Sequence, residues 1–355
     1  MTLALSALAP VLASRGPLDE QPSSDRDAPN ETRSASAQGP DSLSGNDSDF
    51  VSRPVARAPS PDYGMNIFIW DSPQSTERDL NKLVAAGFGW QKSLFQWRLI
   101  EPQPGRFVWT EADRVVKASN AAGVSVIARL DFQPGWARAD RAHNGPPDNY
   151  SDFGDFVYAF VDRYKRGSPH GEVAAIELWN EPNLAREWGN RPIEMAQSVE
   201  YVRLLCIGHR AAKRASADVI TITGGLSPTG TFDAGAVDDT IYLQWMYETF
   251  DAGAVDDTIY LQWMYDAGAK PCFDVLGAHG AGYKAPPWVG PDQLASNKLY
   301  GGHQAFGFRR VEQLREIMVN NGDAGKQVWL LEFGWTSDQV HDDYAWHRVT
   351  EAEKA

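Results

Sequence analysis

From Tyr63 onward the chain alternates between short, mostly apolar segments and longer segments with helical periodicity. Seven short segments have strand character: 64–70, 91–97, 124–132, 174–179, 219–224, 275–279 and 327–333. Between them, helical periodicity is found at 76–86, 111–122, 153–164, 195–215 and 308–320. Short apolar strands are typical of a parallel sheet covered by helices. The alternation therefore predicts an α/β fold, with a (β/α)8 TIM barrel as the leading form.

A doubly wound open sheet is the alternative to a barrel. That fold usually carries a glycine-rich turn after its first strand, whereas this chain has Asp71-Ser72-Pro73 there. The barrel is therefore favoured, but it is predicted to be truncated after the seventh strand. Only 22 residues follow that strand, which is enough to begin a helix at 349–355. A missing strand leaves two unpaired edges, so the prediction is a fragment or an open barrel.

The first 60 residues differ in composition from the rest and are predicted to lie outside the barrel domain, which spans 61–355. The first 14 are apolar and end in Val-Leu-Ala-Ser, like the end of a secretory signal without its basic start. Residues 15–60 are rich in Ser, Asp, Pro, Gly and Arg and resemble a disordered linker. These features favour a secreted or cell-envelope protein, with a cytoplasmic one as the alternative.

Composition excludes several classes of partner. The net charge of −14 argues against a basic face for nucleic acid, and no apolar run approaches the roughly 20 residues of a membrane-spanning helix. The seven His residues show no metal-binding spacing, so no metal or cofactor is predicted. The two cysteines, Cys206 and Cys272, are interpreted as small buried hydrophobic residues rather than a disulfide. The 13 Trp residues fit either core filling or stacking on sugars.

A perfect repeat interrupts the region between the fifth and sixth strands. The sequence TFDAGAVDDTIYLQWMY occurs at 231–247 and again, 18 residues later, at 249–265. Solenoid repeats recur several times and drift in sequence, so this one is interpreted as a recent duplication or an assembly error. The extra copy is expected to loop outside the barrel.

The strongest functional signal is Trp179-Asn180-Glu181-Pro182-Asn183, directly after an apolar strand. The carboxyl ends of barrel strands face the active site, so Glu181 is predicted to lie there. The neighbouring Trp179 is expected to form an apolar wall that raises the pKa of Glu181, as a general acid requires.

A second carboxylate follows the same logic on the seventh strand. Leu331-Glu332-Phe333-Gly334-Trp335 again places a Glu between aromatic residues at the end of a strand. Two carboxylates facing across a sugar are the minimal machinery of glycoside hydrolysis, and a separation of roughly 5 Å gives a retaining reaction.

These two motifs resemble those of glycoside hydrolase clan A, and over residues 63–338 the chain is most similar to family 39, then to family 5. The resemblance implies a retaining glycosidase that cleaves oligo- or polysaccharides by double displacement, without a cofactor. It implies that Glu181 is the acid/base and Glu332 the nucleophile. It implies that Asn180 contacts the sugar 2-hydroxyl, and that His279 and Tyr283 position the nucleophile.

The clan also implies an Arg near the nucleophile, for which Arg98 and Arg129 are the candidates. Position at strand ends adds further candidates for substrate contact, and core packing is the alternative for each: Trp70, Gln96, Trp97, Asp131, Gln133, Trp136 and Trp335. Glu177 lies inside the fourth strand and is expected to pair with an Arg rather than to catalyse.

Two other functions stay open at this point. The truncated barrel and the duplication favour a catalytically impaired carbohydrate-binding remnant as the main alternative. An unrelated α/β enzyme with a coincidental Trp-Asn-Glu-Pro sequence is the third.

Overall fold

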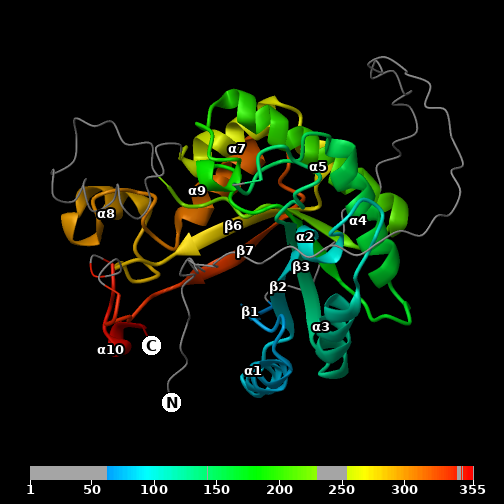
Figure 1. The fold of residues 1–355 in the computed structure, drawn as a ribbon. Helices are drawn as coiled ribbons and strands as arrows, with labels where there is room; N and C mark the ends of the chain where they lie inside the picture. The colour runs from blue at the N-terminus through cyan, green and yellow to red at the C-terminus, as the bar shows by residue number, and fades with distance from the viewer. Residues whose placement is uncertain (1–61, 142, 230–253, 342–344, 346, 355) are drawn as a thin grey trace, which may run out of the picture. The chain divides into compact units, whose positions relative to one another are not determined.

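A computed structural model of the chain describes residues 62–354, except 142, 230–253, 342–344 and 346. The predicted leader at 1–60 and the first copy of the repeat lie outside the described residues. Within them, seven parallel strands form one sheet in chain order, with helices around it (Figure 1). The strands are β1 Gly64–Asn66, β2 Trp90–Gln96, β3 Ser125–Asp131, β4 Ala175–Leu178, β5 Ile220–Thr223, β6 Val275–Ala281 and β7 Gln327–Gly334.

Helices connect the strands, as the alternating pattern predicts. The α-helices are α1 Pro73–Ala85, α2 Trp97–Ile100, α3 Thr110–Ala121, α4 Tyr150–Tyr164, α5 Met195–Ala215, α7 Asp257–Asp266, α8 Pro291–Ser296, α9 Arg310–Asn320 and α10 Glu351–Lys354. Short 3-10 turns are η2 Ala185–Glu187, η3 Lys270–Cys272 and η4 Lys298–Tyr300. The prediction of a parallel α/β barrel with seven strands is confirmed. The main differences are a first strand that ends at Asn66 and a second that ends before Trp97.

The inside of the barrel is apolar at the amino ends of the strands. A small cluster of buried side chains fills it: Ile127, Ala175, Ile220, Ile222, Val275 and Leu331. Two partly buried indoles, Trp90 of β2 and Trp329 of β7, pack against this cluster and meet edge to face at 5.4 Å. This apolar floor leaves the carboxyl ends of the strands for polar side chains.

The outside of the sheet packs on helices through aromatic side chains. Trp97 is fully buried there, stacks on Phe156 of α4 at 5.3 Å and donates from its indole to Glu101 at 2.7 Å. The indole of Trp97 is therefore part of the core in this structure and offers no face to a sugar.

A disulfide joins Cys206 of α5 to Cys272 of η3, with their Cα atoms 4.6 Å apart. The interpretation of both as free buried thiols is wrong. The two residues are 66 positions apart in the chain, but α5 and η3 pack against each other outside β5. Sequence spacing alone does not reveal that neighbourhood.

The second copy of the repeat contributes helix α7. Asp256 caps its first turn by accepting from the Thr258 backbone N–H at 2.9 Å. Arg310, fully buried at the start of α9, lies 2.6 Å from both Asp256 and Asp257. The pairing of these three charges ties the repeat-derived helix to its neighbour in the barrel wall.

The first and last strands of the described sheet approach each other without forming a ladder. The side-chain amide of Asn66 on β1 donates to the backbone oxygen of Leu331 on β7 at 2.9 Å. This contact brings the two margins of the seven-stranded sheet together beside Glu332. No helix of the described residues is long and apolar enough to cross a membrane.

Candidate active site

The turn after β4 places Glu181 at the carboxyl end of the barrel. Trp179 and Glu181 both have positive φ, 79° and 37°, which costs roughly 1–3 kcal/mol for each non-glycine residue. Surrounding hydrogen bonds hold this conformation. The Glu181 N–H donates to Gly225 O at 3.1 Å, and the Asn183 amide donates to Ser227 O at 2.9 Å. The backbone is therefore strained at the predicted acid/base and fixed by the neighbouring loop.

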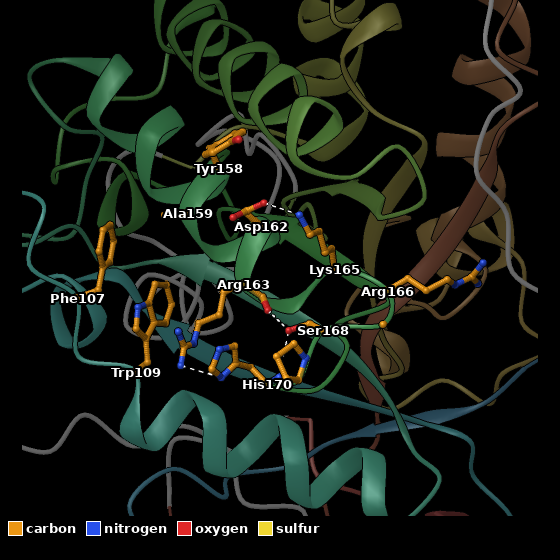
Figure 2. Close-up of a pocket in the computed structure, with 12 residues that line it drawn as sticks. Phe107, Trp109, Tyr158, Ala159, Asp162, Arg163, Lys165, Arg166, Ser168 and His170 are labelled. Atoms are coloured by element: carbon orange, nitrogen blue, oxygen red, sulfur yellow. Dashed lines mark hydrogen bonds and ion pairs between the residues drawn. The ribbon is translucent and has the colours of Figure 1, made fainter.

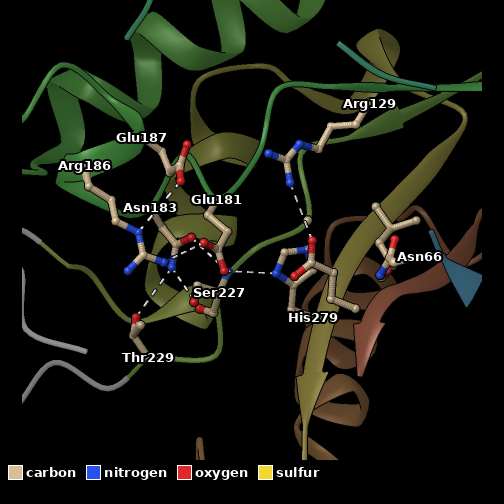
Figure 3. A network of polar contacts seen from close by, with 12 residues as sticks. Asn66, Arg129, Glu181, Asn183, Arg186, Glu187, Ser227, Thr229 and His279 are labelled. Carbon is tan, nitrogen blue, oxygen red and sulfur yellow. Dashed lines mark hydrogen bonds and ion pairs between the residues drawn. The ribbon is translucent and has the colours of Figure 1, made fainter. Parts of the chain in front are cut away.

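His279 of β6 lies between the two predicted catalytic carboxylates, and Figure 3 shows its ring beside Glu181. Its Nδ1 is 3.0 Å from Glu181 Oε1, and its Nε2 is 3.8 Å from Glu332 Oε1. Two short contacts and the width of one imidazole ring therefore limit the separation of these oxygens to at most about 9 Å, so both face one site.

Local backbone features bring the imidazole to this place. His279 pairs in register with Glu332 on β7, next to an irregularity between Ala278 and His279. A side chain at Gly225 would also collide with the ring, because a Cβ there would lie 2.3 Å from His279 Nε2. Glycine at 225 is thus required for the ring to enter.

The charges around His279 favour its protonated form. Burial alone would lower the pKa of His279, but the negative charge of Glu332 and the hydrogen bond to Glu181 outweigh burial and raise it. The protonated ring donates a hydrogen bond from Nδ1 to Glu181, while Nε2 faces Glu332 at 3.8 Å, which is ion-pair but not hydrogen-bond distance. The resemblance implies that His279 helps to position the nucleophile, and the structure places its ring closer to Glu181 than to Glu332.

Glu181 has a second cationic partner. Arg186 of η2 lies 2.8 Å from Glu181 Oε2. Burial would raise the pKa of Glu181, but the hydrogen bond with His279 and the charge of Arg186 hold it well below its usual range.

The expectation that Trp179 raises the pKa of Glu181 is therefore wrong. The Trp179 indole is fully buried, donates to the Glu187 backbone oxygen at 2.9 Å and packs edge to face on Phe153 and Trp188. The positive φ of Trp179 goes with this orientation of its indole, toward Phe153 and Trp188.

Glu332 is surrounded by positive charge. Lys92 Nζ is 3.2 Å from its Oε1 and Arg129 Nη1 is 3.7 Å away. Burial would raise the pKa of Glu332, but the charges of His279 and Lys92, with that of Arg129, lower it. Its side chain keeps 34% exposure.

The contacts show which of the two candidate arginines lies near the predicted nucleophile. Arg129 points at Glu332, whereas the partly exposed Arg98 bonds to Gln96 and lies over the Phe132 ring. Glu177 pairs with Lys92 at 2.8 Å, so its expected arginine partner is in fact a lysine.

The other predicted contact residues occupy varied positions. Asn180 is buried beside Glu181, and its Oδ1 has no hydrogen-bond partner among the described residues. Asp131 is fully buried on Arg129 at 2.9 Å, and burial raises its pKa to about 6. Trp136 is half-buried and donates to the Glu101 backbone oxygen. The role of Asn180 toward a substrate therefore stays a prediction, while Asp131 supports Arg129.

Two further candidates for substrate contact, Tyr283 and Trp335, follow β6 and β7. Trp335 donates to the Ala285 backbone oxygen at 2.9 Å. Tyr283, with φ of 49°, packs on the rings of Phe306 and His347. Their roles toward a substrate stay predictions.

Sequence reasoning missed Lys92, Arg186 and Glu187. Lys92 had a usable signal, because it lies two positions after Trp90 and therefore on the same inward face of β2. Arg186 and Glu187 lie in an irregular loop, where no periodicity reports direction. Glu187 accepts from the Asn144 amide at 2.8 Å, and burial together with the charge of Glu181 raises its pKa to about 7.

Among the described residues, no group of three or more His, Cys, Asp or Glu side chains could hold a metal ion. A cavity of about 590 Å³ lies elsewhere, along the end of α4 (Figure 2). Its Trp109 ring is stacked on Phe107 and covered by Arg163, which is paired with Asp113. These aromatic and charged groups contact one another, so their presence in the cavity is explained by packing and ion pairing.

Comparisons with known proteins support the fold. No protein family profile matches the sequence, and no curated protein matches it. Among solved structures, a glucosidase from Croceicoccus marinus aligns with 79% of this chain and 53% of its own, at 12% identity and a TM-score of 0.51.

Two further structures score slightly lower. A family 39 glycoside hydrolase from Bacteroides cellulosilyticus WH2 aligns with 82% of this chain and 51% of its own, at 20% identity and a TM-score of 0.49. An exo-beta-1,4-mannosidase from Opitutaceae bacterium strain TAV5 covers 82% and 49%, at 18% identity and 0.49. The chain spans about half the length of these neighbours. The described residues thus form a parallel (β/α) barrel whose structural neighbours are glycoside hydrolases.

Proposed function

We propose that this protein is a retaining glycoside hydrolase that uses Glu332 as nucleophile and Glu181 as acid/base. The observation that carries the proposal is the His279 ring, which has Glu181 3.0 Å from Nδ1 and Glu332 3.8 Å from Nε2, at the carboxyl ends of β4 and β7. The structural neighbours are glycosidases, which supports the same class of reaction.

The environment of Glu332 supports its role as the nucleophile. Glu332 is ionised and partly exposed beside Lys92 and Arg129, so its oxygen attacks the anomeric carbon and forms a glycosyl ester. Glu181 gives a proton to the departing oxygen as the glycosidic bond breaks. In the second step Glu181 takes a proton from water, which attacks the ester and releases the sugar with the original configuration.

Asn180 and His279 complete the proposed site. Asn180 lies next to Glu181 in the turn, and its enclosed Oδ1, which has no hydrogen-bond partner among the described residues, is the group that we assign to a sugar hydroxyl. His279 links the two carboxyls, so a proton gained by one changes the field at the other. The substrate class is oligo- or polysaccharide, without a cofactor.

The Cys206–Cys272 disulfide supports a site of action in an oxidising compartment, because such bonds persist outside the reducing cytosol. This agrees with the apolar start of the sequence and favours export of the protein.

Turnover of a panel of 4-nitrophenyl β-glycosides of xylose, glucose and mannose tests the proposal. Glu332→Gly should abolish turnover, and azide should restore it while forming a glycosyl azide of inverted configuration. Glu312→Gly, which changes an exposed carboxylate paired with Arg309, is the matched control and should keep wild-type turnover.

A carbohydrate-binding remnant is the second candidate. The engagement of both Glu181 oxygens by cations favours it, because that carboxylate is ionised and holds no proton to donate. Binding of oligosaccharide without turnover of any glycoside in the panel would establish this function and exclude the hydrolase.

A further inference from the structure

Both oxygens of Glu181 are occupied by cationic groups. His279 Nδ1 lies 3.0 Å from Oε1 and Arg186 lies 2.8 Å from Oε2. A general acid must hold a proton on one oxygen and point it at the departing atom. Oε1 is turned toward His279, so Oε2 is the oxygen that must carry the proton. Arg186 has to leave Oε2 before the proposed reaction can begin.

Arg186 is placed so that it can leave. Its side chain is 51% exposed and extends from the three-residue turn η2. The next residue, Glu187, offers a second carboxylate, with Oε1 at 3.8 Å from Arg186 Nε. The Asn144 amide fixes the other oxygen of Glu187 at 2.8 Å. One guanidinium thus stands between two carboxylates, close to the first and within reach of the second (Figure 3).

We propose that Arg186 is a positioning residue that holds Glu181 ionised at rest and transfers its ion pair to Glu187 when a sugar occupies the leaving-group side of the site. This inference rests on the proposed hydrolase function and assigns a resting and a reactive state to the same carboxyl.

The proton balance of this exchange closes without a co-reactant. Burial and the charges of Glu181 and Asp131 raise the pKa of Glu187 to about 7, so at or below that pH Glu187 can supply the proton. The arriving guanidinium favours ionised Glu187, and the departing guanidinium favours protonated Glu181. One proton leaves Glu187, one proton binds Glu181, and one ion pair replaces another.

Other charges act on the two carboxyls as well. Glu181 faces His279 of β6 and Glu332 of β7, and Glu187 faces Asp131 and Arg129 of β3. These groups are unchanged in the variants below, so a difference between variants reports on Arg186 and Glu187.

The first test needs no substrate. In protein labelled with ¹³C at the Glu carboxyls, NMR titration follows Glu181, which is assigned by its absence in Glu181→Gln. Arg186→Gln should raise the pKa of Glu181 by about 1 unit or more, since an opposite charge at this distance has that effect. Arg191→Gln is the matched control, because Arg191 belongs to the same connection and pairs with Glu200. An unchanged Glu181 titration in Arg186→Gln would overturn the proposal.

The second test uses the pH profile of kcat/KM for an alkyl glycoside, whose departure needs a proton. Arg186→Gln should move the alkaline limb to higher pH. Glu187→Gln should lower kcat/KM about tenfold or more, because the guanidinium loses its second partner. The double variant should follow Arg186→Gln.

An equal loss from Glu187→Gln with and without Arg186 would show that Glu187 supports structure only, and would overturn the transfer. If wild-type protein hydrolyses no glycoside, the proposed function fails, while the titration still decides whether Arg186 controls Glu181. Arg186 is half-exposed, so that titration does not depend on a variant of the buried Glu187.

Discussion

Lys92 Nζ lies 3.2 Å from Glu332 Oε1 and reaches it from β2, 240 positions earlier in the chain. The same ammonium lies 2.8 Å from Glu177, whose side chain is fully buried. One cation therefore neutralises both a carboxylate at the site mouth and one inside the barrel. The proposed nucleophile and the interior of the barrel depend on the same charge.

Lys92→Met is expected to lower the free energy of unfolding by about 3–5 kcal/mol, because it leaves Glu177 as an uncompensated buried charge. Urea unfolding measures the change. The double variant Lys92→Met/Glu177→Gln should recover much of the loss. If the double variant is as unstable as Lys92→Met, the cost is one of packing and the charge argument is wrong.

Glu181→Ala is expected to separate substrates by their leaving groups. Hydrolysis of an alkyl glycoside should fall by roughly 10²–10⁴ in kcat/KM, since that leaving group needs a proton. The 2,4-dinitrophenolate group departs as a stable anion without a proton. A 2,4-dinitrophenyl glycoside should therefore keep most of its kcat/KM. Steady-state kinetics on both substrates makes the comparison, and equal losses on the two would contradict the acid/base assignment.

His209 is expected to make the fold sensitive to acid. It is buried on Thr221, and burial lowers its pKa to about 4, with the charge of Asp274 opposing. Neutral His209 therefore contributes stability above its unfolded pKa, and this contribution is lost as the pH falls from about 6.5 toward 4, by up to about 3 kcal/mol.

Urea unfolding from pH 7 to pH 4 tests this. His209→Gln keeps a polar group near Thr221 and should flatten the dependence over that range. His341→Gln changes an exposed histidine and should leave the wild-type slope. A slope that persists in His209→Gln would assign the acid sensitivity to other groups.

The disulfide is expected to contribute substantially to stability. It closes a loop of 66 residues, for which chain entropy gives about 4 kcal/mol. The double variant Cys206→Ser/Cys272→Ser should lose about that much in urea unfolding. Adding a reductant should destabilise the wild type and leave the double variant unaffected; equal effects on both would exclude the bridge as the cause.

Deleting one copy of the repeat is expected to preserve the fold. Removal of 231–248 and removal of 248–265 produce the same chain, because the two copies are identical. The remaining copy can form α7 and supply Asp256 and Asp257 to Arg310. The midpoint of thermal unfolding should stay within a few degrees, since shortening a loop changes closure entropy by only about 1 kcal/mol. Loss of cooperative unfolding would show that both copies are needed.

Much of the fold was predictable because periodicity reports burial. Helix α5 has the predicted bounds at 195–215, and all seven predicted strands form. Glu181 and Glu332 were predictable for a related reason, since parallel strands place their carboxyl ends at one edge. His279 followed from the resemblance to known glycosidases.

The charges that tune the site were harder to predict. The direction of Trp179 depends on positive φ in a turn, which the sequence pattern does not encode, and the pKa of Glu181 was consequently expected to move the wrong way. Arg186 approaches from an irregular loop, and Cys206 meets Cys272 only after α5 has packed on η3. Such contacts depend on tertiary packing between segments far apart in the chain.

The hydrogen bond from Asn66 to Leu331 affects how firmly Glu332, the proposed nucleophile, is held in place. Glu332 follows Leu331 directly, so its strand is anchored on one flank by the β6 ladder and on the other by a single amide. Transient opening of the contact between β1 and β7 would move the Glu332 carboxylate relative to the His279 ring. The distance between these two groups, and so their electrostatic interaction, would then change. Strand β1, which lies 265 positions earlier in the chain, thus helps to fix the position of the proposed nucleophile.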